Sequence, residues 1–102
     1  MRGRLLVLIY RPNGRGLARW AVVASKKVGG AVGRNRSKRL LREAYRCLRT
    51  RITSDGLDVI LLARPGCSEA RIHEVVQDLS ERCKEAGLLS IDVRPASGTK
   101  SE

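Results

Sequence analysis

The stretch Ser25–Arg51 reads SKKVGGAVGRNRSKRLLREAYRCLRTR; it holds ten Lys or Arg residues and a single acid, Glu43. Three glycines lie between residues 29 and 33, and glycine disfavours a helix interior, so we predict a loop there and a helix from about Asn35 to Arg51. At about 100° per residue, the apolar side chains of this helix share an arc of roughly 160°. We expect that arc to face the core: Leu40, Leu41, Ala44, Tyr45, Cys47, Leu48 and Ile52.

The same helix carries a second, cationic arc of roughly 100° beside the apolar one. It consists of Lys38, Arg39, Arg42, Arg46 and Arg49. A run of charges usually indicates only a solvated surface with ordinary ion pairs. Here one acid cannot offset five clustered cations, which repel one another at neighbouring helix positions. We therefore interpret this arc as a surface that binds phosphates.

Charge is divided unevenly along the whole chain. Residues 1–51 contain 15 basic residues and one acidic residue, which gives a net charge of +14. Residues 52–102 contain six basic and nine acidic residues, which gives a net charge of −3. Such a concentration of Lys and Arg favours polyanionic partners, because phosphates neutralised by these side chains release counterions. The composition indicates a nucleic-acid-binding protein.

The length of 102 residues is that of one domain. We predict one RNA-binding α/β domain over residues 1–92 and a flexible tail over residues 93–102. No apolar run approaches the roughly 20 residues that span a bilayer, and the apolar stretch Leu5–Tyr10 is too short for a signal peptide. We therefore expect a cytoplasmic protein that makes no membrane contact.

Three further segments have strand-like sequences. Arg4–Arg11 and Leu17–Ser25 flank the turn residues Pro12-Asn13-Gly14, so we predict that they pair as a hairpin. Asp58–Ala63 is a continuous apolar run after its first residue, which predicts a strand buried on both faces.

A second helix is predicted from an N-cap at Ser68 to a stop at Gly87. Apolar residues recur there at helical spacing: Ile72, Val75, Val76, Leu79, Cys83 and Ala86. The solvent side is expected to hold Glu74, Asp78, Glu81 and Glu85 among a few cations, so this helix should point away from nucleic acid.

Residues for catalysis or metal binding are scarce. Cys47, Cys67 and Cys83 are widely spaced without a CxxC motif, and His73 is the only histidine, so we expect reduced thiols and no zinc site. A metal-dependent nuclease needs convergent carboxylates, and the basic half of the chain contains only Glu43. We predict no catalytic residue and no metal ligand in this protein.

The glycine-rich connection matches neither a P-loop nor a dinucleotide-binding fingerprint. Backbone amides at the start of a helix nevertheless attract anions. Together with Lys26, Lys27, Arg34 and Arg36, this turn is a candidate clamp for polynucleotide phosphates. The alternative is that its glycines only permit the chain to reverse, and the residues do not separate these two interpretations.

Two motifs in this region resemble the signature of the bacterial ribonuclease P protein component. They are Ser25-Lys26-Lys27-Val28-Gly29, followed by Ala31-Val32, and the run RNRSKRLLREA over residues 34–44. The resemblance extends over residues 1 to about 90. It implies a two-layer α/β sandwich, like domain 2 of ribosomal protein S5, in which a mixed sheet packs with helices. It further implies a left-handed βαβ crossover, which is rare.

The resemblance also implies a function. The protein would be a subunit of a cytoplasmic ribonucleoprotein that removes the 5′ leader from precursor tRNA, with no obligate protein partner. The RNA subunit would perform the hydrolysis with Mg²⁺ held mainly by that RNA, while the protein supports the RNA and contacts the leader.

The residues that match this resemblance divide into two sets. The expected contacts to the catalytic RNA are Lys26, Lys27, Arg34, Asn35, Arg36, Lys38, Arg39, Arg42 and Arg46. The expected leader cleft is the face of the first strand formed by alternate residues, together with two neighbouring positions: Arg4, Leu6, Leu8, Tyr10, Ser25 and Ala31. The chain begins almost at that strand, without the aromatic-bearing helix that precedes it in the family, so we expect weak leader binding.

Two other functions remain compatible with the charge pattern. A ribosome-associated or other structured-RNA-binding protein without a processing role would show the same asymmetry. A DNA-binding module is disfavoured, because a recognition helix normally exposes base-reading Asn or Gln, and this helix offers only Asn35, at its start.

Overall fold

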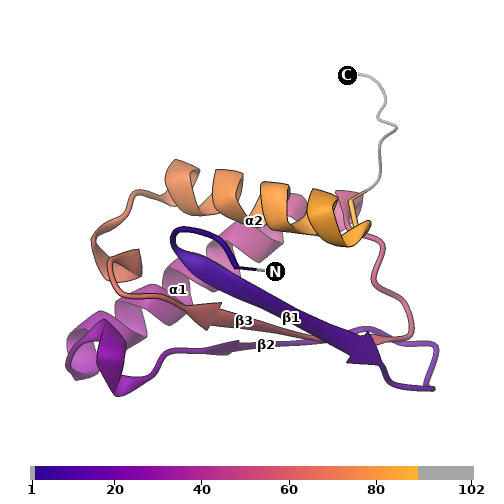
Figure 1. The fold of residues 1–102 in the computed structure, drawn as a ribbon, viewed down its shortest axis with the longest axis horizontal. Coiled ribbons are helices and arrows are strands. Elements are labelled where there is room, and N and C mark those ends of the chain that lie inside the picture. Colours follow the sequence, from indigo (N-terminus) through magenta and orange to yellow (C-terminus); the bar gives the residue numbers. More distant parts are fainter. Residues whose placement is uncertain (1, 90–102) are drawn as a thin grey trace.

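The computed structural model describes residues 2–89, which form a three-stranded sheet with two helices packed against it (Figure 1). The strands are β1 (Leu6–Pro12), β2 (Arg19–Val23) and β3 (Leu57–Ala63), and the helices are α1 (Ala31–Leu48) and α2 (Ile72–Ala86). Three single 3₁₀ turns complete the chain path: η1 (Lys26–Val28), η2 (Arg49–Arg51) and η3 (Cys67–Glu69). The predicted α/β sandwich is confirmed. The predicted tail, residues 93–102, lies outside the described residues.

The strand order is β1-β3-β2, so the predicted hairpin between the first two strands is wrong. β3 lies between them, antiparallel to β1 and parallel to β2. The physical reason is the length of the connection: residues 13–18 form a six-residue loop, long enough to cross the roughly 10 Å that separates two strands with a third between them. The turn chemistry at Asn13 and Gly14 was correctly identified, since Gly14 has φ of 69°, but such chemistry does not specify which strand pairs with which.

β2, α1 and β3 form a parallel βαβ unit. In Figure 1 both strands point towards the left with α1 behind them, and this arrangement makes the crossover left-handed. The resemblance implied this hand, which is the uncommon one for such connections. α1 is thereby held across the sheet and directly against α2.

The core lies between the sheet and the two helices. From the sheet it takes Leu8, Val59 and Leu61, and from the helices it takes fully buried residues such as Leu41 and Leu79. The predicted apolar arc of α1 is confirmed at Leu41, Ala44 and Leu48, all buried, whereas Cys47 at its margin is exposed. Cys67 and Cys83 are buried, and burial raises the pKa of Cys83 to about 11.

Both helices begin at positions different from those predicted. α1 starts at Ala31, four residues before Asn35, so Gly33 belongs to its first turn. A Cβ at Gly33 would lie 3.7 Å from the Ser68 hydroxyl oxygen, which shows how closely this turn approaches η3. Ser68 belongs to η3 and does not cap α2, which starts at Ile72. At that start the carboxylate of Glu74 accepts a hydrogen bond from the backbone N–H of Arg71 at 2.8 Å.

Asp78 was predicted on the solvent side of α2, and this prediction is wrong. Its side chain is buried against the chain that enters β1. Its carboxylate accepts hydrogen bonds from the backbone N–H groups of Leu5 and Leu6, at 2.9 and 3.2 Å. A Cβ at Gly3 would come within 2.3 Å of the same carboxylate. The chain entering β1 is therefore fixed to α2 by a buried carboxylate, a role that a pattern of charged residues alone does not reveal.

No helix within residues 2–89 is long and apolar enough to cross a membrane. Over the same residues, no three His, Cys, Asp or Glu side chains gather in a way that would hold a metal ion.

Replacing Asp78 with Ala should lower the free energy of unfolding by on the order of 3 kcal/mol, because two buried backbone N–H groups would lose their acceptor. Urea denaturation at neutral pH measures this change. Glu81→Ala on the exposed surface of the same helix is the matched control and should change stability by less than about 0.5 kcal/mol. Equal effects of the two substitutions would contradict the assigned role of Asp78.

Candidate nucleic-acid interface

The cationic face of α1, which we define as Lys38, Arg39, Arg42, Arg46 and Arg49, adjoins the buried arc of the helix. Four of its members are exposed and Lys38 is half-buried. Together with Asn35 and Glu43, the first four line a shallow hollow of about 370 Å³. The helix therefore buries its apolar residues and presents its cations to solvent, as the sequence predicted.

Few of these cations are neutralised within the described part of the chain. Arg46 forms an ion pair with Glu43 at 2.6 Å, on an exposed surface where such pairs contribute little. No ion pair is formed by Lys38, Arg39, Arg42 or Arg49 with any residue from 2 to 89. The face thus retains an excess of positive charge, which a polyanion would relieve.

The predicted contacts at the start of α1 have more varied surroundings. Lys26 and Lys27 lie exposed in η1, where the Ser25 hydroxyl accepts a hydrogen bond from the Lys27 N–H at 3.3 Å. Gly29 follows with φ of 142°, a conformation that side chains disfavour. Arg36 is exposed, but its guanidinium donates to the Ser68 carbonyl, so it also ties α1 to η3.

The first turn of α1 contains no acidic residue, and its N-cap, Gly30, has no side chain to cap the helix. The backbone N–H groups of that turn therefore point outward beside the two lysines of η1. This arrangement is compatible with the anion clamp that the sequence suggested, and the glycines also permit the chain reversal that was its alternative.

The predicted leader cleft is wrong at two of its six residues. Leu6 and Leu8 are fully buried between the sheet and the helices, so they cannot contact a ligand. Tyr10, on the same face, is 39% exposed. Arg4 is exposed and lies 3.7 Å from Glu74. Alternation correctly placed Leu6, Leu8 and Tyr10 on one face, but Leu6 and Leu8 are covered by the helices.

The opposite face of the sheet carries apolar residues and no helix from residues 2–89 covers it. The strand register places its members in three rows: Val7–Leu62–Val23, Ile9–Ile60–Ala21 and Arg11–Asp58–Arg19. We call these nine residues the outer sheet face. Ile9 is 48% exposed and Ile60 is 39% exposed. The apolar run of β3 predicted a strand buried on both faces, and this prediction is wrong for the outer sheet face.

One end of the outer sheet face is polar and well organised. The Arg19 guanidinium donates two hydrogen bonds to the Asp58 carboxylate, at 2.8 and 2.7 Å, and the Asn13 side-chain amide donates a third at 3.0 Å. These hydrogen bonds hold the pKa of Asp58 well below its ordinary value, and those from Arg19 have the largest effect. Beside this polar end, a hollow of about 610 Å³ is lined by Ile9, Ile60 and neighbouring residues of all three strands.

His73 is exposed on α2. Glu43 is the only acidic residue in the hollow of the cationic face. The interface thus offers two surfaces to a ligand, a cationic helix face and a partly apolar sheet face, and neither carries a cluster of carboxylates.

Comparison with known proteins gives a consistent result. The family profile described as Ribonuclease P matches residues 1–87. The ribonuclease P protein component of Caldanaerobacter subterraneus subsp. tengcongensis is 38% identical over 85 residues, covering 83% of this chain and 72% of that protein. That of Dehalococcoides mccartyi is 39% identical over 88 residues, covering 86% and 71%.

Solved structures show the same relationship. The RNase P protein of Staphylococcus aureus superposes with a TM-score of 0.74 at 26% identity, covering 88% of this chain and 82% of that one. The RNase P protein of Thermotoga maritima gives a TM-score of 0.71 at 27% identity, covering 83% and 80%.

Proposed function

The chain belongs to the ribonuclease P protein family, the protein component of a tRNA-processing ribonucleoprotein, and we propose a separate RNA-binding role for each of its two surfaces. The cationic face and the glycine-rich start of α1 bind the catalytic RNA. The outer sheet face contacts the single-stranded 5′ leader of precursor tRNA. The observation that carries the proposal is the cationic face, whose charge is exposed and largely unneutralised by the described residues.

Binding to the RNA subunit follows from charge and shape. Arg39 and Arg42 extend from one exposed face of an 18-residue helix, where their guanidinium groups are able to pair with phosphates along an RNA backbone. Lys26, Lys27 and Arg34 extend the positive surface around the helix start, where uncapped N–H groups add a favourable dipole. A ribosome-associated role would use the same contacts, but family membership favours ribonuclease P.

The chemical step belongs to the RNA subunit in this proposal. Hydrolysis of a phosphodiester assisted by Mg²⁺ needs oxygen ligands that converge on the metal. Glu43 is the only acid in the hollow of the cationic face, and it pairs with Arg46. On the outer sheet face, Asp58 is already held by Arg19 and Asn13. These carboxylates do not form a metal site, so Mg²⁺ would be held by the RNA, and the holoenzyme would act in the cytoplasm.

Leader binding is assigned to the outer sheet face because of its composition. An unpaired RNA strand combines apolar base surfaces with phosphates. The exposed Ile9 and Ile60 suit the former, while Arg11 at the end of the same face suits the latter. This places the leader on the side of the sheet opposite to the helices, and away from the buried Leu6 and Leu8.

Reconstitution with a bacterial ribonuclease P RNA tests the proposed function directly. We expect the protein to lower the Mg²⁺ or salt concentration at which that RNA cleaves precursor tRNA, because its cations reduce repulsion between the two RNAs. The purified protein alone should cleave nothing. Nuclease activity that survives removal of all RNA, or no stimulation of the RNA subunit, would contradict the proposal.

Replacing Arg39 or Arg42 with Ala should weaken binding to the RNA subunit and reduce the salt slope of binding by about 0.7–0.9 for each lost phosphate contact. Thermal stability should change little, because both side chains are exposed. Filter binding at several salt concentrations measures the slope. Lys84→Ala, which removes an exposed cation from α2, is the matched control and should leave the slope unchanged.

A double substitution, Ile9→Thr with Ile60→Thr, tests the outer sheet face while keeping β-branched side chains in both strands. It should lower the preference of the holoenzyme for precursor over mature tRNA several-fold, since both residues would lose apolar contact with the leader. Affinity for the two tRNAs is measured under identical conditions. Leu17→Thr, at an apolar loop residue that is 72% exposed, is the control. An unchanged preference in the double variant would exclude this face.

A further inference from the structure

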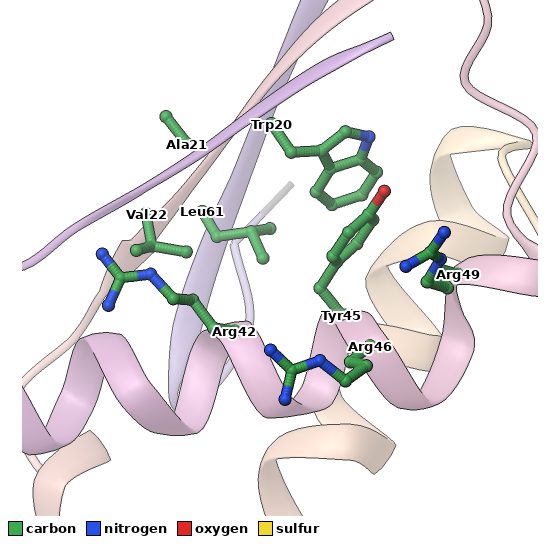
Figure 2. A pocket seen from close by; sticks show the side chains of 8 residues that line it. All are labelled: Trp20, Ala21, Val22, Arg42, Tyr45, Arg46, Arg49 and Leu61. Carbon is green, nitrogen blue, oxygen red and sulfur yellow. The ribbon is translucent and has the colours of Figure 1, made fainter.

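A pocket of about 480 Å³ lies between the edge strand β2 and α1, beside the cationic face (Figure 2). No local pattern in the sequence reveals it, because its residues come from β2, β3, α1 and η2, which only the fold brings together. We call it the aromatic pocket. It is lined by Trp20, Ala21, Val22, Arg42, Tyr45, Arg46, Arg49 and Leu61. Its volume lies within the range of small-ligand sites in proteins.

Two aromatic rings form one wall of the aromatic pocket. The Trp20 and Tyr45 ring centroids are 4.4 Å apart and the ring planes are inclined by 32°. The Trp20 indole N–H donates a hydrogen bond to the Ser54 hydroxyl at 3.0 Å, which sets the orientation of the indole. Both side chains are only half-buried, so the pair is rigid and yet open to the pocket.

The rest of the aromatic pocket is strongly positive. Arg42, Arg46 and Arg49 lie along its helix side, as Figure 2 shows, and no acidic residue lines it. Arg46 pairs with Glu43, whereas within residues 2–89 neither Arg42 nor Arg49 forms an ion pair. Aromatic surface and unneutralised guanidinium groups at one opening suit a ligand that is both planar and anionic.

The position of the aromatic pocket fits RNA in particular. It shares Arg42 and Arg46 with the hollow of the cationic face, so an RNA strand bound there would run past the pocket opening. β2 is one of the two edge strands of the sheet and, within residues 2–89, pairs only with β3. Its other edge therefore leaves backbone N–H and C=O groups without a strand partner from the described chain, and these groups are able to meet the polar edge of a base.

We propose that the aromatic pocket binds one unpaired nucleotide of an RNA, with the base packed on the Trp20–Tyr45 pair and its phosphates on Arg42 and Arg49. The proposal rests on the RNA-binding function proposed above and adds a contact with a base to contacts with the backbone. The alternative is that the ring pair only closes the edge of the core. That role would explain the stacking but neither the open volume nor the arginines around it.

Trp20 is the only tryptophan of the chain and lines both the aromatic pocket and the hollow beside the outer sheet face. A change in its fluorescence is therefore assigned to the aromatic pocket only where the variant Tyr45→Leu abolishes it. The full chain is titrated with hexauridylate and with an abasic RNA hexamer that carries the same phosphates. We expect hexauridylate to quench the emission and to bind roughly tenfold tighter than the abasic hexamer, because stacking of one base contributes that much affinity. Equal affinities and equal emission changes for the two hexamers would overturn the proposal.

Substitutions locate the effect. Tyr45→Leu should reduce the affinity ratio of the two hexamers to about one, and its thermal denaturation is recorded to verify that it folds. Arg49→Gln removes the positive charge of an exposed side chain and should lower affinity for hexauridylate without unfolding the protein. Arg51→Gln is the matched control, because Arg51 is an exposed cation of η2 outside the aromatic pocket. A ratio that is unchanged in folded Tyr45→Leu would also overturn the proposal.

A final comparison separates the two proposals and identifies the RNA. Trp20 emission is measured with ribonuclease P RNA and with precursor tRNA added separately, and quenching by one of them identifies the source of the nucleotide. If the RNA subunit binds in a manner that depends on Arg39 and yet neither RNA alters the emission, the aromatic pocket is excluded and the proposed function stands. If neither RNA binds at all, the proposed function fails as well.

Discussion

The packing of α1 on the sheet through Leu41, Ala44 and Leu48 is the contact on which the other features depend. Fully burying a leucine side chain stabilises a fold by about 1.5–3 kcal/mol, so this arc determines how the helix is rotated about its axis. The cations occupy the adjoining arc of the same helix. Burying the apolar arc therefore turns the cationic face towards solvent, and no further interaction is needed to orient it.

The same packing produces an electrostatic repulsion among the cations of α1 that the described residues, 2–89, largely leave in place. Cations three and four positions apart on a helix repel each other, and Glu43 neutralises only Arg46 among them. A bound polyanion would relieve this repulsion, so the free energy lost in the free protein is recovered on binding. The buried carboxylate of Asp78 shows the contrast, because its hydrogen bonds to the Leu5 and Leu6 backbone are internal and serve the fold itself.

β2 links the surfaces that we assign to RNA. Its residues alternate, so that Trp20 and Val22 turn towards α1 and the aromatic pocket while Arg19 and Val23 turn towards the outer sheet face. A strand at the edge of a sheet can contribute to a helix-side site and to the opposite face within five residues. Catalytic RNA on the cationic face and leader on the outer sheet face would accordingly approach each other along this strand.

The sequence by itself determined the elements and their chemistry. Helical periodicity identified the buried and cationic arcs of α1, since both depend only on spacing along one helix, and the scarcity of acids in residues 1–51 indicated a polyanionic partner. The signature around Arg34 and Arg36 identified the family through resemblance, and with it the crossover, which local propensity does not specify.

Only the tertiary structure decided which surfaces those elements expose. Alternation grouped Leu6 with Leu8 but cannot distinguish the covered side of a sheet from the open one, and the helices cover that side. Turn chemistry at Asn13 predicted a chain reversal, whereas the insertion of β3 between β1 and β2 depends on contacts between residues about 50 positions apart. The contact between Trp20 and Tyr45 has a similar origin. The crossover brings β2 and α1 together, and a contact between residues 25 positions apart leaves no local pattern in the sequence.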